Sequence, residues 1–260
     1  MKRVDLNCDM GEVTAAVIGG AQEELLRYVT SANVACGAHA GDAAMMQATI
    51  EQCLRHGVAI GAHPGYEDRA NFGRIELKLS REEIAASVHQ QVRALAEIAA
   101  RCGAQISHVK PHGALYNQAA RERELAQAIA EGVARWRTEV VLVGLAGSAM
   151  LEEFRAAGFS VAAEVFADRR YESDGSLRSR QFPDALLKNP EEAAAQAVQI
   201  VEQYSVIAAD GSTVPLHAQT ICIHGDTPGA TQIAAAVHRA LRAAGVALKP
   251  IAQTGPTRPV

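Results

Sequence analysis

Short apolar runs alternate with helical segments along nearly the whole chain, and this alternation limits the folds that the chain can adopt. Runs with the length and composition of strands cover residues 3–9, 31–36, 58–63, 106–112, 139–145, 160–166, 219–224 and, more weakly, 246–251. The segments between them repeat apolar residues at helical spacing. A repeated strand–helix order is typical of a parallel sheet, because parallel neighbours need a long crossover connection.

The length of the chain favours one closed barrel over an open sheet or two domains. With 260 residues, the chain can form a complete α/β barrel around a full core. We therefore expect a single TIM-like β/α-barrel domain over residues 1–260. Periodicity alone does not separate a closed barrel from an open doubly wound sheet.

Local signals mark the helix ends between these strands. Ser80 and Glu83 have the spacing of a capping box, and Asn189 precedes Pro190 at the start of another helix. Asp42 can cap the helix that follows the second strand.

Two connections are long for a barrel of this size, and they cover residues 64–79 and 167–188. Both connections are polar and contain glycine. Long polar loops at the end of a strand often carry binding residues. We therefore expect these two loops to line or cover a substrate.

Charge and patterning exclude several classes of protein. The net charge is -4 and the pI is about 6.1, so we expect no nucleic-acid partner. Apolar runs stay well short of the roughly 20 residues that span a bilayer, and the N-terminus lacks the apolar segment of a secretory signal. We therefore expect a cytoplasmic protein without a membrane partner. The five cysteines form no C-x-x-C pair, which disfavours a disulfide framework or a thiolate zinc site.

Polar side chains share one face of several expected strands. Side chains alternate in direction along a strand, and Asp5, Asn7 and Asp9 occupy the odd positions of the first strand, opposite its apolar residues. In a barrel the apolar face meets the helices, so the polar face points inward. The same alternation, with His63 at the end of the third strand, gives a group that we call the inward set: Asp9, His63, Lys110, His112, Glu164, His224 and Asp226.

The inward set predicts an active site. Buried charges cost several kcal/mol unless they are paired or hydrogen-bonded, and barrel interiors are normally filled by branched aliphatic residues. Barrel enzymes carry their catalytic residues at the carboxyl ends of the strands. The alternative is a self-satisfied buried ion network. Because the polar residues come from many strands, we expect the inward set to be catalytic.

Residues beside the inward set are candidates for substrate binding. They are Asp5, Asn7, Glu12, Asn33, His39, Asp42, Arg74, Asp168, Arg169 and Tyr171. Arg169 suits a phosphate or a carboxylate, because its planar guanidinium binds such groups with two parallel hydrogen bonds. His39 lies in a glycine-rich loop whose backbone N–H groups can bind an anion. The structural alternatives are an Asx turn at Asp9, a surface histidine at His39 and a helix cap at Asp42.

Part of this group has the composition of a metal site. Histidines from several strand ends, together with one carboxylate, are common ligands of zinc, iron and manganese. His63, His112 and Asp9 meet that rule by residue type. Their spacing matches no fixed metal motif, so a divalent metal, either magnesium or a transition metal, is one reading of the site. The sequence has no P-loop, H-E-x-x-H or G-x-S-x-G motif, which disfavours a P-loop ATPase and a serine hydrolase.

Taken in order, several segments resemble the LamB/YcsF family, which is identified with the A subunit of the ATP-dependent 5-oxoprolinase. The segments are DLNCDMGE (5–12), SANVACGAHAGD (31–42), GAHPG (61–65), FGR (72–74), VKPHGALYN (109–117), EVFADRRY (164–171) and ICIHGD (221–226). The resemblance implies a seven-stranded β/α barrel of the glycoside hydrolase/deacetylase type. It also implies cleavage of 5-oxo-L-proline to L-glutamate, coupled to hydrolysis of ATP to ADP and phosphate, with partner subunits B and C.

The chain departs from the usual family pattern at three places. Val13 follows Glu12 where a Phe-Gly stretch is usual, and Ile75 stands where a second arginine often follows Arg74. Gln219 takes the place of an acidic residue. These departures concern two loops and the start of one strand, and they leave the inward set unchanged.

The implied reaction requires three tasks of the side chains. Lys110 and Arg169 are the candidates for neutralising phosphate charge. A carboxylate among Asp9, Glu164 and Asp226 takes a proton from water, and a histidine of the inward set protonates the departing nitrogen.

Two rival functions remain at this stage. One is a metal-dependent amide or N-acetyl hydrolase of the barrel deacetylase type, acting alone. The other is a non-catalytic subunit that binds 5-oxoproline and presents it to partner enzymes. The sequence leaves open where ATP binds.

Overall fold

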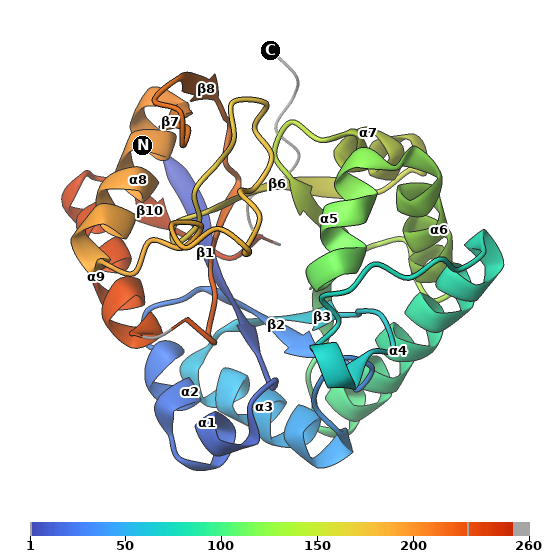
Figure 1. Cartoon of the computed structure of the whole chain (residues 1–260). Helices are drawn as coiled ribbons and strands as arrows, with labels where there is room; N and C mark the ends of the chain where they lie inside the picture. The colour runs from blue at the N-terminus through green and yellow to red at the C-terminus, as the bar shows by residue number, and fades with distance from the viewer. Residues whose placement is uncertain (1, 228, 252–260) are drawn as a thin grey trace.

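A closed barrel of parallel strands forms the centre of the molecule (Figure 1). The computed structural model describes residues 2–227 and 229–251. Within this part of the chain, seven strands close the barrel: β1 (Arg3–Met10), β2 (Ser31–Ala35), β3 (Ala59–His63), β4 (Ile106–Val109), β5 (Val141–Leu145), β6 (Ser160–Phe166) and β9 (Thr220–Ile223). Pairing of β9 with both β6 and β1 completes the ring. The seven-stranded barrel expected from the sequence is confirmed.

Helices surround the barrel and bury its outer face (Figure 1). They are α1 (Thr14–Ile18), α2 (Ala21–Leu25), α3 (Ala43–His56), α4 (Arg81–Arg101), α5 (Gly113–Arg121), α6 (Arg123–Ala134), α7 (Ala149–Ala156), α8 (Pro190–Gln203) and α9 (Ala230–Ala243), with the 3-10 turn η1 at Arg69–Asn71. The expected caps are present. Ser80 and Glu83 form the capping box of α4, and Asp42 accepts a hydrogen bond from the backbone N–H of Met45.

Two short additions lie outside the ring. The hairpin of β7 (Ser205–Ile207) and β8 (Thr213–Pro215) follows α8. The strand β10 (Ala247–Leu248) pairs with the first residues of β1, before β9 takes the place beside that strand. None of the helices within the described residues has the length and apolar composition of a membrane span.

The fourth strand is shorter than the sequence pattern indicates. It ends at Val109, so Lys110 and His112 lie in the connection to α5 and not in the strand expected over 106–112. Pro111 has no N–H group and cannot continue the ladder of hydrogen bonds. The chain nevertheless stays beside its neighbour, because the N–H groups of Lys110 and His112 donate to carbonyls of the segment around β3.

Below the mouth of the barrel, hydrogen-bonded polar side chains fill part of the interior beside β1 and β2. Asp5 accepts hydrogen bonds from the hydroxyls of Thr30, Ser31 and Thr220, and all of these bonds cross between neighbouring segments. His108 occupies space that Gly61 leaves open, since a Cβ at Gly61 would overlap the His108 ring. These contacts support the floor of the site above them.

Candidate functional site

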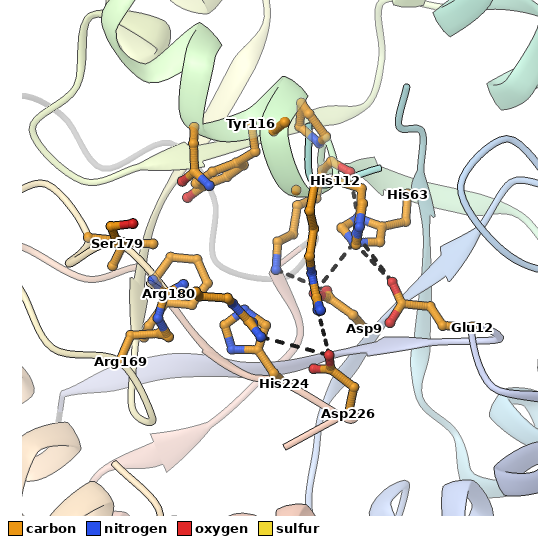
Figure 2. Close-up of a pocket in the computed structure, with 18 of the residues that line it drawn as sticks. Asp9, Glu12, His63, His112, Tyr116, Arg169, Ser179, Arg180, His224 and Asp226 are labelled. Carbon is orange, nitrogen blue, oxygen red and sulfur yellow. Dashed lines mark hydrogen bonds and ion pairs between the residues drawn. The ribbon is translucent and has the colours of Figure 1, made fainter. Parts of the chain in front are cut away.

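A cavity of about 430 Å³ opens at the mouth formed by the carboxyl ends of the barrel strands (Figure 2). Six members of the inward set line it: Asp9, His63, Lys110, His112, His224 and Asp226. Glu164 lies just below, is fully buried and contacts Lys110. Because these residues come from β1, β3 and β6 and from the segments after β4 and β9, only the closed barrel brings them together.

Some of the expected substrate-binding residues line the cavity, and others do not. Glu12, Arg74 and Arg169 line it. Asp168 is buried behind His224, and His39 is buried behind Glu12.

The remaining expected residues lie away from the cavity wall and support the structure. They are Asp5, Asn7, Asn33, Asp42 and Tyr171. Asn33 donates hydrogen bonds to Asn7 and Asp9, and the hydroxyl of Tyr171 accepts one from the N–H of Phe166. Asp42 caps the N-terminus of α3, which is the structural role that the sequence offered as the alternative to substrate binding.

Several cavity residues were not found by sequence reasoning. They are Tyr116, Asn117, Phe166, Ser179, Arg180 and Gln181. Arg180 and its neighbours belong to the long loop 167–188, and the length and polarity of that loop were the available signal. Tyr116 and Asn117 lie on α5 and fall outside any strand-end pattern.

Three histidines, His39, His63 and His112, form a cluster with Glu12 at one side of the cavity. Figure 2 shows His63, His112 and Glu12. The ring N–H of His63 at Nδ1 donates to the carbonyl of Lys110 at 2.8 Å, and His112 Nε2 donates to the carbonyl of Phe72 at 2.9 Å. A carbonyl oxygen only accepts, so these bonds fix both tautomers. The two other nitrogens, His63 Nε2 and His112 Nδ1, face each other at 2.9 Å.

Glu12 holds the cluster together from the opposite side. Its carboxylate oxygen lies 3.2 Å from His112 Nδ1, 3.1 Å from His39 Nε2 and 3.9 Å from His63 Nε2. The rings of His39 and His112 are stacked in parallel, with centroids 3.7 Å apart. Two imidazole lone pairs and a carboxylate therefore point at one small volume, which favours a cation there, either a proton or a metal ion.

The donor set of this cluster fits a transition metal better than magnesium. The ligand atoms of Glu12, His39, His63 and His112 lie within 4.8 Å of one another. Nitrogen-rich sites suit zinc, iron or manganese, whereas magnesium prefers oxygen ligands. Metal-binding histidines usually donate their second ring N–H to a carbonyl or carboxylate, as His63 and His112 do.

The carboxylate expected as a metal ligand lies on the edge of this cluster. Asp9 Oδ2 is 3.4 Å from His63 Nε2, and Asp9 also belongs to a second group with Cys222 and His224. Glu12, which the sequence predicted as a substrate-binding residue, lies 3.2 Å from His112 Nδ1, so the candidate set becomes Glu12, His63 and His112 with Asp9 beside it.

A loop with unusual backbone angles positions the histidines. Phe72 and Gly73 both have positive φ angles, 57° and 63°. This left-handed turn aims the Phe72 carbonyl at His112. A Cβ at Gly73 would lie 2.8 Å from the Cβ of His39, so the chain passes too close to the cluster for a larger residue.

Lys110 is buried and fully engaged. Its Nζ lies 3.0 Å from Asp9 Oδ1, 2.9 Å from Glu164 Oε1 and 3.1 Å from Cys222 Sγ. An ammonium has three N–H donors, so these contacts use all of them. Lys110 therefore neutralises the buried carboxylates of the floor. The sequence made it a candidate for binding phosphate, but its three N–H groups are already engaged within the protein.

The charges of the floor follow from these contacts. Burial opposes ionisation of Asp9, yet His63 and Lys110 hold its pKa well below the usual range. Burial also opposes the charge on Lys110, but Asp9 and Glu164 raise its pKa well above the usual value. Burial lowers the pKa of His39 to about 4, so this ring is neutral at pH 7. The floor is thus an ionised carboxylate–lysine network beside a neutral imidazole.

A second imidazole is oriented by a buried carboxylate on the other side of the cavity. His224 Nδ1 lies 3.0 Å from Asp168 Oδ1, and the ring stacks on Phe166 with a centroid distance of 5.3 Å. Burial opposes ionisation of Asp168, but the charge and hydrogen bond of His224 lower its pKa. Because Nδ1 is bonded to Asp168, Nε2 is the ring nitrogen that remains for proton transfer in the cavity.

Comparisons with known proteins agree with this architecture. The A subunit of a 5-oxoprolinase from Chloroflexus aggregans is 51% identical over 249 residues, which are 96% of this chain and 99% of the relative. The corresponding 5-oxoprolinase protein from Bordetella pertussis is 48% identical over 246 residues, covering 95% of this chain and 98% of the relative.

Solved structures show the same fold. A lactam utilization protein from Thermus thermophilus is 42% identical and superposes with a TM-score of 0.87, covering 95% of this chain and 99% of that chain. A family 4 carbohydrate esterase from Streptomyces lividans, 12% identical, gives a TM-score of 0.55 over 100% of this chain and 98% of its own. The second likeness concerns the fold alone.

The family relationship rests on nearly the full length of the chain. The model of the LamB/YcsF family matches residues 4–255, which include all segments that line the cavity. The chain therefore belongs to the LamB/YcsF family.

Proposed function

We propose that this chain is the catalytic barrel of an ATP-dependent 5-oxoprolinase, which opens the cyclic amide of 5-oxo-L-proline to give L-glutamate. In this proposal it acts with partner subunits B and C, and ATP is hydrolysed to ADP and phosphate. The observation that carries the proposal is the 51% identity, over 96% of the chain, to a protein named as the A subunit of 5-oxoprolinase. The 42% identity to a protein named for lactam utilization supports the same substrate class.

The chemistry of a lactam explains why ATP is needed. An amide is a poor electrophile, and its hydrolysis at neutral pH is slow. Transfer of a phosphoryl group from ATP to the amide oxygen makes the ring carbon more reactive toward water. Addition of water and cleavage of the C–N bond leave an acyl phosphate, which a second water hydrolyses to L-glutamate and phosphate. The cavity of about 430 Å³ has room for a five-membered ring and an attacking water.

We assign proton transfer to Asp9 and His224. Asp9 is an ionised carboxylate on the cavity wall and takes a proton from the attacking water. His224 has one ring nitrogen bonded to Asp168 and uses the other to protonate the departing nitrogen. Glu164 is less suited because it is fully buried. Asp226 is ion-paired with Arg74 as Asp9 is with Lys110, and we prefer Asp9 because its Oδ2 lies 3.4 Å from His63 Nε2, which can share the proton.

The histidine cluster adds a second chemical resource. Held by Glu12, His63 and His112, a divalent transition metal would polarise an amide oxygen or lower the pKa of a water molecule. The contribution of the protein itself is orientation, because the carbonyls of Lys110 and Phe72 fix the two imidazoles.

We propose that the partner subunits complete the nucleotide site and that the enzyme acts in the cytoplasm. The sequence contains no P-loop, and Lys110 is already bonded to two carboxylates, so neither a P-loop nor Lys110 is available for the phosphates of ATP. All five cysteines are free thiols, which suits a reducing compartment.

A second candidate function is a metal-dependent amide hydrolase that acts alone. The specific observation in its favour is the convergence of Glu12, His63 and His112 on one volume. It predicts amide hydrolysis by the isolated chain without ATP.

One experiment separates these functions. The chain is mixed with subunits B and C, and glutamate formed from 5-oxo-L-proline is measured with and without ATP. We expect glutamate only with ATP and all three subunits, and a loss of at least 100-fold for Asp9→Asn. Glutamate formed without ATP by the chain alone would favour the hydrolase, and no glutamate under any condition would contradict both. Glutamate formation that survives Asp9→Asn would leave this chain a binding subunit.

A further inference from the structure

One wall of the cavity is strongly basic. Arg74 comes from the loop after β3. Arg169 and Arg180 come from the loop 167–188 (Figure 2). Asp226 is the carboxylate that pairs with this wall, bonded to Arg74 and 3.8 Å from Arg180. The wall therefore carries more positive than negative charge.

Among the described residues of this wall, Arg169 is the cation without an ion pair. Its side chain is only 4% exposed, and its Nε has no hydrogen-bond partner among the described residues. Its Nη2 donates to the carbonyl of Arg178 at 2.6 Å, which fixes the guanidinium but adds no negative charge. The ion pairs of this wall do not include Arg169 within the part of the chain that the structure describes.

A buried guanidinium without an anion is costly to the folded protein. Arginine stays protonated in proteins, and a buried charge costs several kcal/mol unless an opposite charge accompanies it. Burial and the nearby Arg180 lower the pKa of Arg169 to about 10, which still leaves it charged at neutral pH. Its neighbour Asp168 is engaged by His224 and Thr227. The cavity is thus built to receive an anion beside Arg169.

The opposite side of the cavity has the reverse sign. The carboxylates of Asp9 and Glu12 line that side, next to the ring nitrogens of His63 and His112. In the metal-free chain an anionic group is repelled from this side, whereas a neutral group with a donor and an acceptor, such as an amide, is suited to it. A ligand with one anionic and one amide end therefore has a single favourable orientation.

We propose that Arg169, assisted by Arg180, forms a carboxylate subsite that selects acidic lactams and turns their ring amide toward Asp9 and the histidine cluster. The proposal rests on the proposed function for the identity of the amide, and on the uncompensated Arg169 for the anion. It assigns a specificity role to the loop 167–188. A neutral lactam of the same ring size is expected to bind without a preferred orientation.

The test measures binding to the full chain by calorimetry. The ligands are 5-oxo-L-proline, its neutral carboxamide and inorganic phosphate. We expect the wild-type chain to bind the acid about 10-fold or more tightly than the carboxamide, because a charge-assisted hydrogen bond has that strength. Arg169→Gln is expected to remove this preference and Arg180→Gln to reduce it. Arg170→Gln is the matched control, since Arg170 is adjacent in the chain but does not line the cavity.

Two results would overturn the proposal. One is equal binding of the acid and the carboxamide by the wild-type chain. This result would overturn the proposal even if the chain bound phosphate through Arg169. The other is an unchanged preference in the Arg169→Gln chain. Neither depends on turnover, so a chain that prefers the acid through Arg169 but forms no glutamate with its partners would contradict only the proposed function.

The thermal stability of the variants separates a binding role from a structural one. An arginine kept for a ligand strains the empty protein, so Arg169→Gln is expected to leave Tm unchanged or raise it. The acid should raise the Tm of the wild-type chain and not that of Arg169→Gln. A lower Tm in the variant, with no ligand effect in either protein, would mark Arg169 as structural. If Arg169→Gln fails to fold, Arg180→Gln carries the test of the ligand preference.

Discussion

His63 Nε2 and His112 Nδ1 face each other at 2.9 Å, although each ring already donates its other N–H group to a backbone carbonyl. Two neutral imidazoles in this arrangement would point their lone pairs at each other. A cation between or beside them removes the conflict, and the carboxylates of Asp9 and Glu12 lie near enough to attract one. This pair is the central feature of the site.

The first prediction concerns metal binding. We expect the purified chain to bind about one equivalent of zinc or manganese, as a site with this number of convergent donors does. His112→Ala should weaken binding by at least 100-fold, because it removes a ligand atom and not only an outer contact. Calorimetry with metal-free protein measures this effect. His217→Ala is the control, because His217 does not line the cavity and its ring stacks on Tyr204 instead. Tight binding that His112→Ala leaves unchanged would argue against the site.

The second prediction concerns Lys110 and stability. Lys110→Met leaves the carboxylates of Asp9 and Glu164 buried without their cation, so we expect a loss of about 3–5 kcal/mol in the free energy of unfolding. Urea denaturation at pH 7 measures this loss. Lys188→Met is the comparison, since that side chain is exposed and should change stability by less than about 0.5 kcal/mol. Similar values for the two variants would refute the role of Lys110 as the counterion of the floor.

The third prediction concerns the pH dependence of stability through Asp5. Burial raises the pKa of Asp5 from 3.8 to about 6, so the folded protein holds this proton more tightly than the unfolded chain. The resulting stabilisation is present in full below pH 4 and is lost as the pH rises through 6. A difference of this size corresponds to about 3 kcal/mol. Asp5→Asn cannot ionise, so its free energy of unfolding, relative to the wild type, should increase by that amount between pH 4 and pH 7. A constant difference across this range would show that Asp5 does not titrate as proposed.

The fourth prediction concerns the pair of Asp168 and His224. Asp168→Asn keeps the shape of the side chain but removes the charge that orients the imidazole. In the assembled enzyme we expect kcat to fall by about 100-fold to 10,000-fold, with a smaller change in KM. The double variant with His224→Gln should lose little more than either single variant, because the two residues act as one unit. Additive losses would indicate that Asp168 acts independently of His224.

The sequence predicted the barrel and much of the site because both depend on local patterns. Alternation with period two placed Asp9, Lys110 and His224 on the inward side of their segments, and the cavity contains all three. The same alternation did not predict how deep along the barrel axis each inward side chain lies. Asp5 points inward as expected, yet its partners are hydroxyl groups below the cavity.

The pairing of charges was beyond the reach of sequence reasoning. Lys110 was expected to bind phosphate, but it meets Glu164 at 2.9 Å, and the two residues lie 54 positions apart in the sequence. The register between strands brings them together, and no local signal encodes it. Similarly, Arg180 joins the cavity only because the loop 167–188 folds back over the mouth of the barrel.

What the sequence alone determined was which side chains face inward and which family the segments resemble, since strand parity and motif order are properties of the chain itself. The tertiary structure decided which inward side chains reach the cavity, which of them are neutralised by partners, and that Arg169 lies on the described cavity wall without an ion pair. The physical reason is that burial and Coulomb energy depend on distances across the closed barrel, and these distances exist only after all strands have paired.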